Sequence, residues 1–345
     1  MTAAPLHVAV FGAAGLVGGE LLRLLSLHPR VGALTAVSKS HAGKTAGDVH
    51  KAMLHLPAVS LVDLPPAEAA AGVDAVFCTM AHGESQTVMP ALLASGARCV
   101  IDLGADFRLN DAAVFAKHYG EHTCPDLQAC FVYGLPEAYR DRIRSARAIA
   151  NPGCFATACQ LLLLPLAAAG KLPATLPVFA VTGSSGAGAT PKSTTHHPFR
   201  SDNLFAYKML AHQHEPEIDQ TLTDLAHAPR RVRLLAHSGP FVRGIHATAY
   251  LHDPALANVD LAALFRDYYA PHPFVTVLKR APEVAEVAGS NFVHVHVAQR
   301  GPEVELLLVL DNLVKGAAGQ AIQNMNLVLG FAETDGLQHP GAYPC

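Results

Sequence analysis

The feature that most constrains the fold of this chain is a strand, glycine turn and helix pattern near its beginning. His7 to Gly12 is apolar and β-prone, and it runs directly into Gly12-Ala-Ala-Gly15-Leu-Val-Gly18. Leucines then recur at helical spacing from Glu20 to Leu27. In such a unit the glycines let the backbone approach a pyrophosphate, and the helix start supplies unpaired N–H groups. The pattern predicts a dinucleotide site, although glycines that only allow close helix–strand packing give the same spacing.

Alternation of strands and helices continues through the first 150 residues. The predicted strands are His7–Gly12, Ala33–Val37, Val73–Thr79, Arg98–Leu103 and Arg147–Ala150, and the predicted helices include Ser85–Ala94 and Ala112–Tyr119. Such alternation with short loops predicts an α/β domain with a parallel, doubly wound sheet of the Rossmann type.

The pattern changes after Asn151, where one helix, Phe155–Ala169, is followed mainly by strands. These strands are Pro177–Thr182, Arg231–Ala236, Ile245–Leu251, Phe274–Lys279, Asn291–Ala298 and Val304–Leu310. Strands in close succession predict an α+β domain with a mixed or antiparallel sheet. We therefore expect a dinucleotide-binding domain at 1–153 and a catalytic domain at 154–313. The final helix, 314–332, starts with small residues and is expected to pack back on the first domain.

Composition excludes several classes of protein. The net charge of −3 gives no basic field for nucleic acid or an acidic membrane. Half of the residues are hydrophobic, but no apolar run approaches the roughly 20 residues that a membrane span needs. The start of the chain lacks a signal-peptide pattern and the seven cysteines are odd in number, so we expect a cytoplasmic protein with free thiols. Cys78, Cys99, Cys130 and Cys159 are interpreted as small buried hydrophobic residues.

The end of the second strand carries information on the cofactor. An acidic residue there would bind the ribose 2′-hydroxyl of NAD and repel a 2′-phosphate. The chain instead has Ser38-Lys39-Ser40, which favours NADP. Gly183-Ser-Ser-Gly-Ala-Gly188 is a second glycine-rich loop that either holds a phosphate or only turns the chain.

Cys154 follows a short strand and the sharp turn Asn151-Pro-Gly153, and it opens a helix. The positive end of the helix dipole stabilises a thiolate, and the helix-start N–H groups can hold an oxyanion. The alternative interpretation is a small buried cysteine. Cys124 and Cys130 with His118 and His122 match no standard zinc spacing, so no metal site is predicted.

The segment His212-Gln-His214-Glu-Pro-Glu217 places two histidines and two carboxylates within six residues. His214 could move protons for Cys154, while Glu217 could orient it or bind substrate. Arg108 and Arg243 are candidate anchors for anionic substrate groups, although a solvated or ion-paired arginine is the alternative for each.

Together these segments resemble the N-acetyl-γ-glutamyl-phosphate reductase family, the arginine-biosynthetic relative of aspartate-semialdehyde dehydrogenase. The resemblance covers nearly the whole chain and rests on motifs in the family's order. These are Gly12–Gly18, Asp102-Leu-Gly-Ala-Asp-Phe-Arg108, Asn151-Pro-Gly-Cys154, Ser185–Gly188, His212–Glu217, Arg243-Gly-Ile245 and Asp311-Asn-Leu-Val-Lys-Gly-Ala-Ala-Gly-Gln320.

The resemblance implies NADPH-dependent reduction of a small acyl phosphate through a cysteine thioester, in a homo-oligomer that is a dimer or a tetramer. It implies that Cys154 is the nucleophile and His214 the acid/base. With the motifs above, the predicted cofactor-binding residues are Gly12, Ala13, Gly15, Leu16, Val17, Gly18, Ser38, Lys39, Ser185, Gly186, Asn312 and Gly316. The predicted substrate-binding residues are Arg108, Asn151, Ser185, His212, Glu217 and Arg243.

The chain departs from the family's pattern at Phe155-Ala156, where an aromatic residue and proline are common, and at Gln213, where arginine is common. Thr190–His197 is also similar to the lysine-pathway branch, which reduces an aminoadipyl homologue. No basic run is available to dock an acidic carrier protein, so we expect a free substrate with the five-carbon glutamyl skeleton. Two further alternatives are a Cys/His hydrolase, which would leave the glycine motif without a role, and a dinucleotide-binding regulator with an inert Cys154.

Overall fold

The predicted N-terminal unit forms as strand, turn and helix. The protein is described by a computed structural model that covers residues 4–343. Strand β1 (Leu6–Phe11) is buried at all positions but one, as expected for a strand that is covered on both faces. Helix α1 (Leu16–Leu25) follows the glycine turn and buries Leu21, Leu22 and Leu25. Long-range backbone contacts divide the chain into two units, residues 1–152 with 317–338 and residues 153–316 with 339–345.

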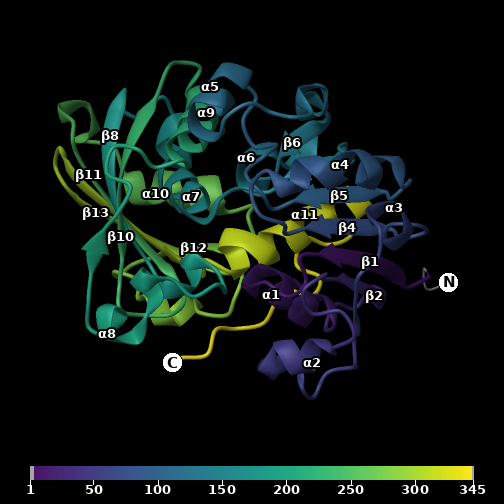
Figure 1. The fold of residues 1–345 in the computed structure, drawn as a ribbon. Helices are drawn as coiled ribbons and strands as arrows, with labels where there is room; N and C mark the ends of the chain where they lie inside the picture. The colour runs from purple at the N-terminus through teal and green to yellow at the C-terminus, as the bar shows by residue number, and fades with distance from the viewer. Residues whose placement is uncertain (1–3, 344–345) are drawn as a thin grey trace. The chain divides into compact units, whose positions relative to one another are not determined.

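The first unit contains a seven-stranded sheet in the order β3-β2-β1-β4-β5-β7-β6, and every pair in it is parallel (Figure 1). This confirms the predicted doubly wound sheet. The remaining strands are β2 (Val31–Val37), β3 (Leu61–Val62), β4 (Ala75–Cys78), β5 (Cys99–Asp102), β6 (Phe131–Tyr133) and β7 (Ala148–Ala150).

Helices cover both faces of this sheet. The chain moves from β1 through α1 to β2 in one direction along the sheet, and from β4 through α4 to β5 in the other, so right-handed crossovers place α1 and α4 on opposite faces. Helix α11 contacts α1, α6 and β5. The other helices of this unit are α2 (Ala46–Val49), α3 (Pro66–Ala69), α4 (Glu84–Ala94), α5 (Ala112–Tyr119), α6 (Pro136–Arg144) and α11 (Gly319–Leu329).

The second unit contains a mixed seven-stranded sheet in the order β12-β13-β14-β11-β8-β10-β9, again as predicted. Its pairs are antiparallel except β8 with β10 and β12 with β13. The strands are β8 (Thr175–Thr182), β9 (Phe205–Ala206), β10 (Arg231–Ser238), β11 (Ile245–His252), β12 (Val275–Leu278), β13 (Val293–Arg300) and β14 (Glu303–Leu310).

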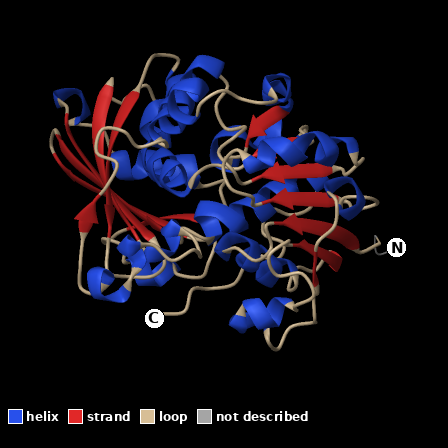
Figure 2. Cartoon of the chain, viewed as in Figure 1, coloured by secondary structure: helices blue, strands red, loops and turns tan. Residues whose placement is uncertain are grey.

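One face of the second sheet is covered by helices and the other is largely bare (Figure 2). Helices α7 (Cys154–Ala168), α9 (Glu215–Ala226) and α10 (Leu261–Tyr269) contact its strands, and α8 (His197–Arg200) lies in a connecting loop. In β8 the buried residues Leu176, Val178 and Ala180 alternate with exposed ones, which include Phe179. Such alternation is typical of a sheet with one packed face.

Several predictions of local structure were wrong or incomplete. Cys130, which was predicted to be buried, is exposed, because it ends a 3₁₀ helix, Pro125–Cys130, that buries none of its residues. The Gly183–Gly188 segment forms a 3₁₀ turn at Ser184–Ala187. The last predicted helix begins with a π-helical turn, Val314–Ala318. The short strands β3, β6 and β9 were not predicted because two or three residues carry no alternation. Among residues 4–343, no helix is long and apolar enough to cross a bilayer.

Candidate active site

Cys154 is the first residue of α7 in the second unit. Gly153 caps this helix with extended backbone, and no side chain caps its N–H groups. The Cys154 side chain is half-buried. Because the first N–H groups of a helix have no partner within the helix, the Cys154 thiol lies where a negative charge is stabilised.

Glu217 and His214 both approach the residue before Cys154. Glu217 is fully buried, and its Oε2 accepts the Gly153 amide at 3.0 Å. The other carboxylate oxygen lies 3.9 Å from His214 Nε2. A Cβ at position 153 would lie only 2.4 Å from that same nitrogen, so glycine at this position lets the His214 ring lie against the backbone next to Cys154.

His212 supports His214 and is itself almost completely buried. Its Nδ1 accepts the His214 amide at 3.2 Å, and its ring packs against Phe155 at 5.4 Å and His214 at 4.9 Å between centroids. Burial, together with the neighbouring His214, lowers the pKa of His212 to about 3. His212 is therefore neutral at physiological pH, with 2% of its surface exposed.

Tyr207 belongs to this cluster and was not predicted. Its ring lies 5.7 Å from that of His212. Burial first, and then the charge of Cys154, raise the pKa of Tyr207. A single tyrosine in a long irregular segment has no spacing that marks it, so sequence reasoning could not have selected it.

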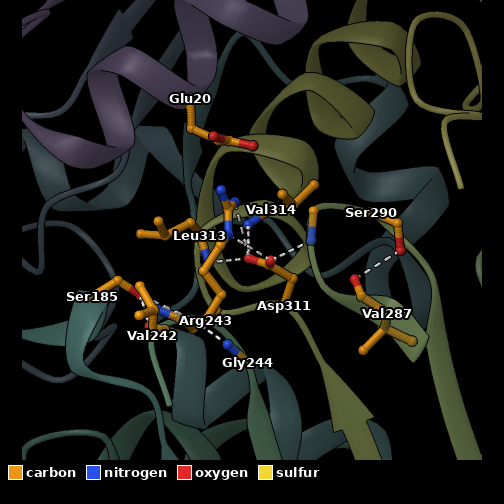
Figure 3. A network of polar contacts seen from close by, with 12 residues as sticks. Glu20, Ser185, Val242, Arg243, Gly244, Val287, Ser290, Asp311, Leu313 and Val314 are labelled. Carbon is orange, nitrogen blue, oxygen red and sulfur yellow. Dashed lines mark hydrogen bonds and ion pairs between the residues drawn. The ribbon is translucent and has the colours of Figure 1, made fainter. Parts of the chain in front are cut away.

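A glycine also lies against Cys154 from the far end of the second unit. The Gly316 amide donates to the Asp311 carbonyl at 2.9 Å, and a Cβ at Gly316 would lie 2.8 Å from Cys154 Cβ. Arg243, a predicted substrate residue, is ion-paired with Asp311 through Nε and Oδ2 at 2.9 Å (Figure 3). Its side chain nevertheless keeps 29% of its surface exposed.

The predicted residues Ser185 and Asn312 are in direct contact. Asn312 Nδ2 donates to Ser185 Oγ at 3.0 Å, and Ser185 Oγ donates to the Val242 carbonyl at 2.6 Å. Gly186 follows in the same 3₁₀ turn. The second unit therefore brings Cys154, His214 and Glu217 together, and it joins the Ser185 turn to the Val242–Gly244 segment.

The glycine loop lies in the first unit, and its three glycines serve different purposes. Gly12 has a φ of +78°, and a Cβ there would lie 2.6 Å from Thr79 Oγ1. A Cβ on Gly18 would lie 2.4 Å from the Gly12 carbonyl oxygen, so this glycine allows helix α1 to pack on the loop. Gly15 meets only the Gly12 oxygen, at 3.4 Å.

Gly15 is therefore the glycine that leaves room for a ligand. It caps α1 without a side-chain hydrogen bond, and the first turn of α1 carries no acidic residue. Uncapped N–H groups with no competing carboxylate fit a pyrophosphate. Ala13 donates to the Val37 carbonyl at 3.0 Å, and the predicted residues Leu16 and Val17 begin the helix.

His50 lies against the same loop and was not predicted. Its Nε2 is 2.8 Å from the Ala13 carbonyl oxygen, and a Cβ on Gly19 would lie 2.4 Å from its Nδ1. In the sequence, only Gly19 indicated that a side chain packs closely against the start of α1. Ser38 is buried directly after β2, whereas Lys39 is exposed.

The other predicted residues of the first unit lie in the segments that follow β5 and β7. Arg108 is buried and donates to the Leu103 carbonyl at 2.8 Å. Asn151 accepts from Asn324 at 3.1 Å and donates to the Ala317 carbonyl at 3.2 Å. Burial, together with the charge of Asp106, raises the pKa of Asp102 to about 7. Among residues 4–343, no group of three or more His, Cys, Asp or Glu side chains is arranged to hold a metal.

Two family models match the chain. Residues 7–146 match the semialdehyde dehydrogenase NAD binding domain, and residues 154–312 match the semialdehyde dehydrogenase dimerisation domain. Solved structures agree on the fold. Aspartate semialdehyde dehydrogenase II from Vibrio cholerae has a TM-score of 0.73 at 19% identity, covering 95% of this chain and 99% of that one. The Candida albicans aspartate semialdehyde dehydrogenase with NADP has a TM-score of 0.72 at 17% identity, covering 94% and 99%.

Curated relatives are much closer in sequence. The N-acetyl-gamma-glutamyl-phosphate reductase of Methanosphaera stadtmanae is 42% identical over 98% of this chain and 99% of its own length. The reductase of the same name from Symbiobacterium thermophilum is 44% identical over the same shares of the two chains. The chain therefore belongs to the N-acetyl-gamma-glutamyl-phosphate reductase family of semialdehyde dehydrogenases.

Proposed function

We propose that this protein reduces N-acetyl-γ-glutamyl phosphate to N-acetylglutamate 5-semialdehyde, with NADPH as reductant and release of phosphate. The observation that carries the proposal is the arrangement of His214 and Glu217 around the backbone that precedes Cys154. The names of relatives more than 40% identical over nearly the whole chain support the same activity. The reaction would serve arginine biosynthesis, and six free thiols among residues 4–343 suit the cytoplasm.

Cys154 is the nucleophile in this proposal. Its thiolate attacks the acyl carbon, a C–S bond forms, and the C–O bond to phosphate breaks, so that phosphate leaves with the bonding electrons. The oxyanion that forms on the way is held by N–H groups in the first turn of α7. The Gly153 amide is not among them, because it donates to Glu217. A thioester on Cys154 remains.

His214 manages the proton on the substrate oxygen. It lies against Gly153, the residue before Cys154, and Glu217 holds the same stretch of backbone. His214 donates a proton to the oxygen as the carbonyl is reduced, and it accepts that proton when the hemithioacetal collapses to the aldehyde. His212 stays neutral and keeps the His214 backbone in place.

We assign the first unit to the dinucleotide and the second to catalysis. The uncapped start of α1 at Gly15 fits a pyrophosphate, and Ser38 and Lys39 are suited to a 2′-phosphate. The other predicted cofactor residues, Ser185, Gly186, Asn312 and Gly316, belong to the second unit. When bound, NADPH supplies the hydride that takes the thioester to the aldehyde level.

The substrate's anionic groups need cationic partners. Arg243 is the proposed partner of the α-carboxylate, since its guanidinium is held by Asp311 yet partly exposed. Arg108, Ser185 and Asn151 are proposed for the phosphate end. Glu217 and His212 are nearly fully buried, and we propose that they act on the substrate through His214 and Gly153.

We also propose that the bare face of the second sheet binds a second copy of the chain. Leu235, Phe179 and Thr248 are neighbours across β10, β8 and β11, and Leu307 of β14 continues the row. Leu235 and Phe179 are 47% and 37% exposed. A row of mostly apolar side chains across several strands is typical of a protein interface, and these residues fall within the matched dimerisation domain. We propose a dimer, or a tetramer built from such dimers.

The substrate can be tested in the reverse direction, with phosphate and NADP⁺. N-acetylglutamate 5-semialdehyde should have a higher kcat/KM than its six-carbon aminoadipate homologue, by about 10-fold or more, since one methylene in a pocket changes selectivity by roughly 1–3 kcal/mol. Steady-state kinetics on both aldehydes provide the measurement. A preference for the six-carbon aldehyde would move the protein to the lysine-pathway branch.

Replacement of the two reactive residues should separate binding from chemistry. Cys154→Ala should abolish turnover and leave NADPH binding unchanged, while His214→Asn should lower kcat by about 10²–10⁴-fold. Cys130→Ala, which removes an exposed thiol, is the matched control and should keep full activity. Full kcat in His214→Asn across the pH profile would require another acid/base.

Lys39 should decide between the two dinucleotides. Lys39→Ala should raise KM for NADPH by about tenfold, the value of one charge-assisted phosphate contact, and leave KM for NADH unchanged. Lys117→Ala, another exposed lysine of the first unit, is the control. An equal rise in KM for NADPH and NADH would show that Lys39 does not contact the 2′-phosphate.

The proposed dimer face can be tested with a single charge. Leu235→Asp should give a monomer by light scattering after gel filtration, because an unpaired carboxylate buried in an apolar interface costs several kcal/mol. Leu54→Asp, at a leucine that is 59% exposed in the first unit, is the control and should keep the wild-type mass. An oligomer of unchanged mass in Leu235→Asp would place the interface elsewhere.

A further inference from the structure

Asp311 is a fully buried carboxylate directly after β14, and it takes no part in the chemical steps of the proposed reaction (Figure 3). Burial of an unpaired carboxylate is costly, so its partners indicate what it holds in place. These partners come from three segments that are far apart in the sequence.

Backbone amides fix the carboxylate itself. Oδ1 accepts the amides of Leu313 at 2.8 Å and Val314 at 3.0 Å, which begin the π-helical turn. Oδ2 accepts the Gly289 amide at 2.6 Å. Three backbone donors leave the carboxylate little freedom to turn, because moving either oxygen would leave a buried N–H group without a partner.

The Arg243 guanidinium meets this fixed carboxylate edge-on. Nε donates to Oδ2 at 2.9 Å, and Nη2 lies 3.4 Å from Oδ1. Because the guanidinium is planar, two contacts along one edge set both its direction and its rotation. The opposite edge of the plane therefore also has a set direction.

The backbone of Arg243 is fixed by the residue next to Asp311. Asn312 Oδ1 accepts the Gly244 amide at 2.7 Å. Gly244 has a φ of +113°, and a Cβ there would lie 2.2 Å from Val284 Cγ1. Two consecutive residues, Asp311 and Asn312, thus hold two consecutive residues, Arg243 and Gly244.

We propose that Asp311 is a positioning residue that aims the Arg243 guanidinium at the α-carboxylate of the substrate. This inference rests on the proposed function, in which Arg243 binds that carboxylate. Asp311 does not touch substrate. It acts on the substrate through Arg243, so we expect a much larger effect on substrates that carry the carboxylate than on those that lack it.

The test compares two aldehydes that differ only in the α-carboxylate. N-acetylglutamate 5-semialdehyde carries it, and 4-acetamidobutanal has the same chain without it. Asp311→Asn keeps the shape of the side chain and removes its charge. We expect KM for the carboxylate-bearing aldehyde to rise by about tenfold or more, while KM for 4-acetamidobutanal and for NADP⁺ changes by less than about twofold.

Glu303→Gln is the matched control, because it also removes a carboxylate that pairs with an arginine of the second unit, Arg300 at 2.8 Å, in an exposed hairpin. It should leave both KM values unchanged. If Asp311 had only a structural role, Asp311→Asn would instead raise KM for both aldehydes by the same factor. An equal rise in KM for both aldehydes, or a wild-type KM for both, would overturn the proposal.

A second variant keeps the test valid if Asp311→Asn does not fold. Arg243→Lys retains a cation beside Asp311 but has no planar edge, so it should lose carboxylate preference as fully as Arg243→Gln. Wild-type KM in Arg243→Lys would show that the direction set by Asp311 has no effect, and would overturn the inference. Failure of the proposed function looks different, because the wild-type protein would then turn over neither aldehyde, or both equally well.

Discussion

The structure around Cys154 depends on two glycines, Gly153 and Gly316, that leave room for neighbouring side chains. A Cβ at Gly153 would lie 2.4 Å from His214 Nε2, and a Cβ at Gly316 would lie 2.8 Å from Cys154 Cβ. Heavy atoms that are not bonded to one another do not approach so closely, so any other residue would displace the histidine or the thiol. Both glycines allow a packed contact, and neither has a positive φ.

Two buried carboxylates hold the chain at these places. Glu217 accepts the Gly153 amide, and Asp311 accepts the amides that open the turn before Gly316. Hydrogen bonds from backbone amides to an ionised carboxylate are stronger than neutral ones, and a buried carboxylate left without them is costly. Glu217 thus fixes the backbone directly before the proposed nucleophile, and Asp311 fixes the start of the turn that leads to Gly316.

Much of this arrangement could be predicted from the sequence, and the failures have physical reasons. Parallel strands such as β1 are long apolar runs between glycine and helix signals, so the doubly wound sheet was predictable. Cys154 and His214 could be selected as candidates because turn and helix-start residues surround them. Tyr207 and His50 have no local pattern, because their contacts form only after folding. Asp311 belongs to a recognisable motif, but its contacts with Gly289 and Arg243 could not be predicted from that motif. Cys130 was misassigned because composition alone does not distinguish an exposed thiol from a buried one.

The central claim is that Cys154 carries the acyl group as a thioester before reduction. The most direct measurement is mass spectrometry of the protein mixed with N-acetyl-γ-glutamyl phosphate in the absence of NADPH. We expect rapid release of phosphate equivalent to the active sites and an N-acetylglutamyl adduct on the peptide that contains Cys154. The adduct should disappear when NADPH is added. Phosphate release that requires NADPH, or an adduct on any other residue, would contradict this account.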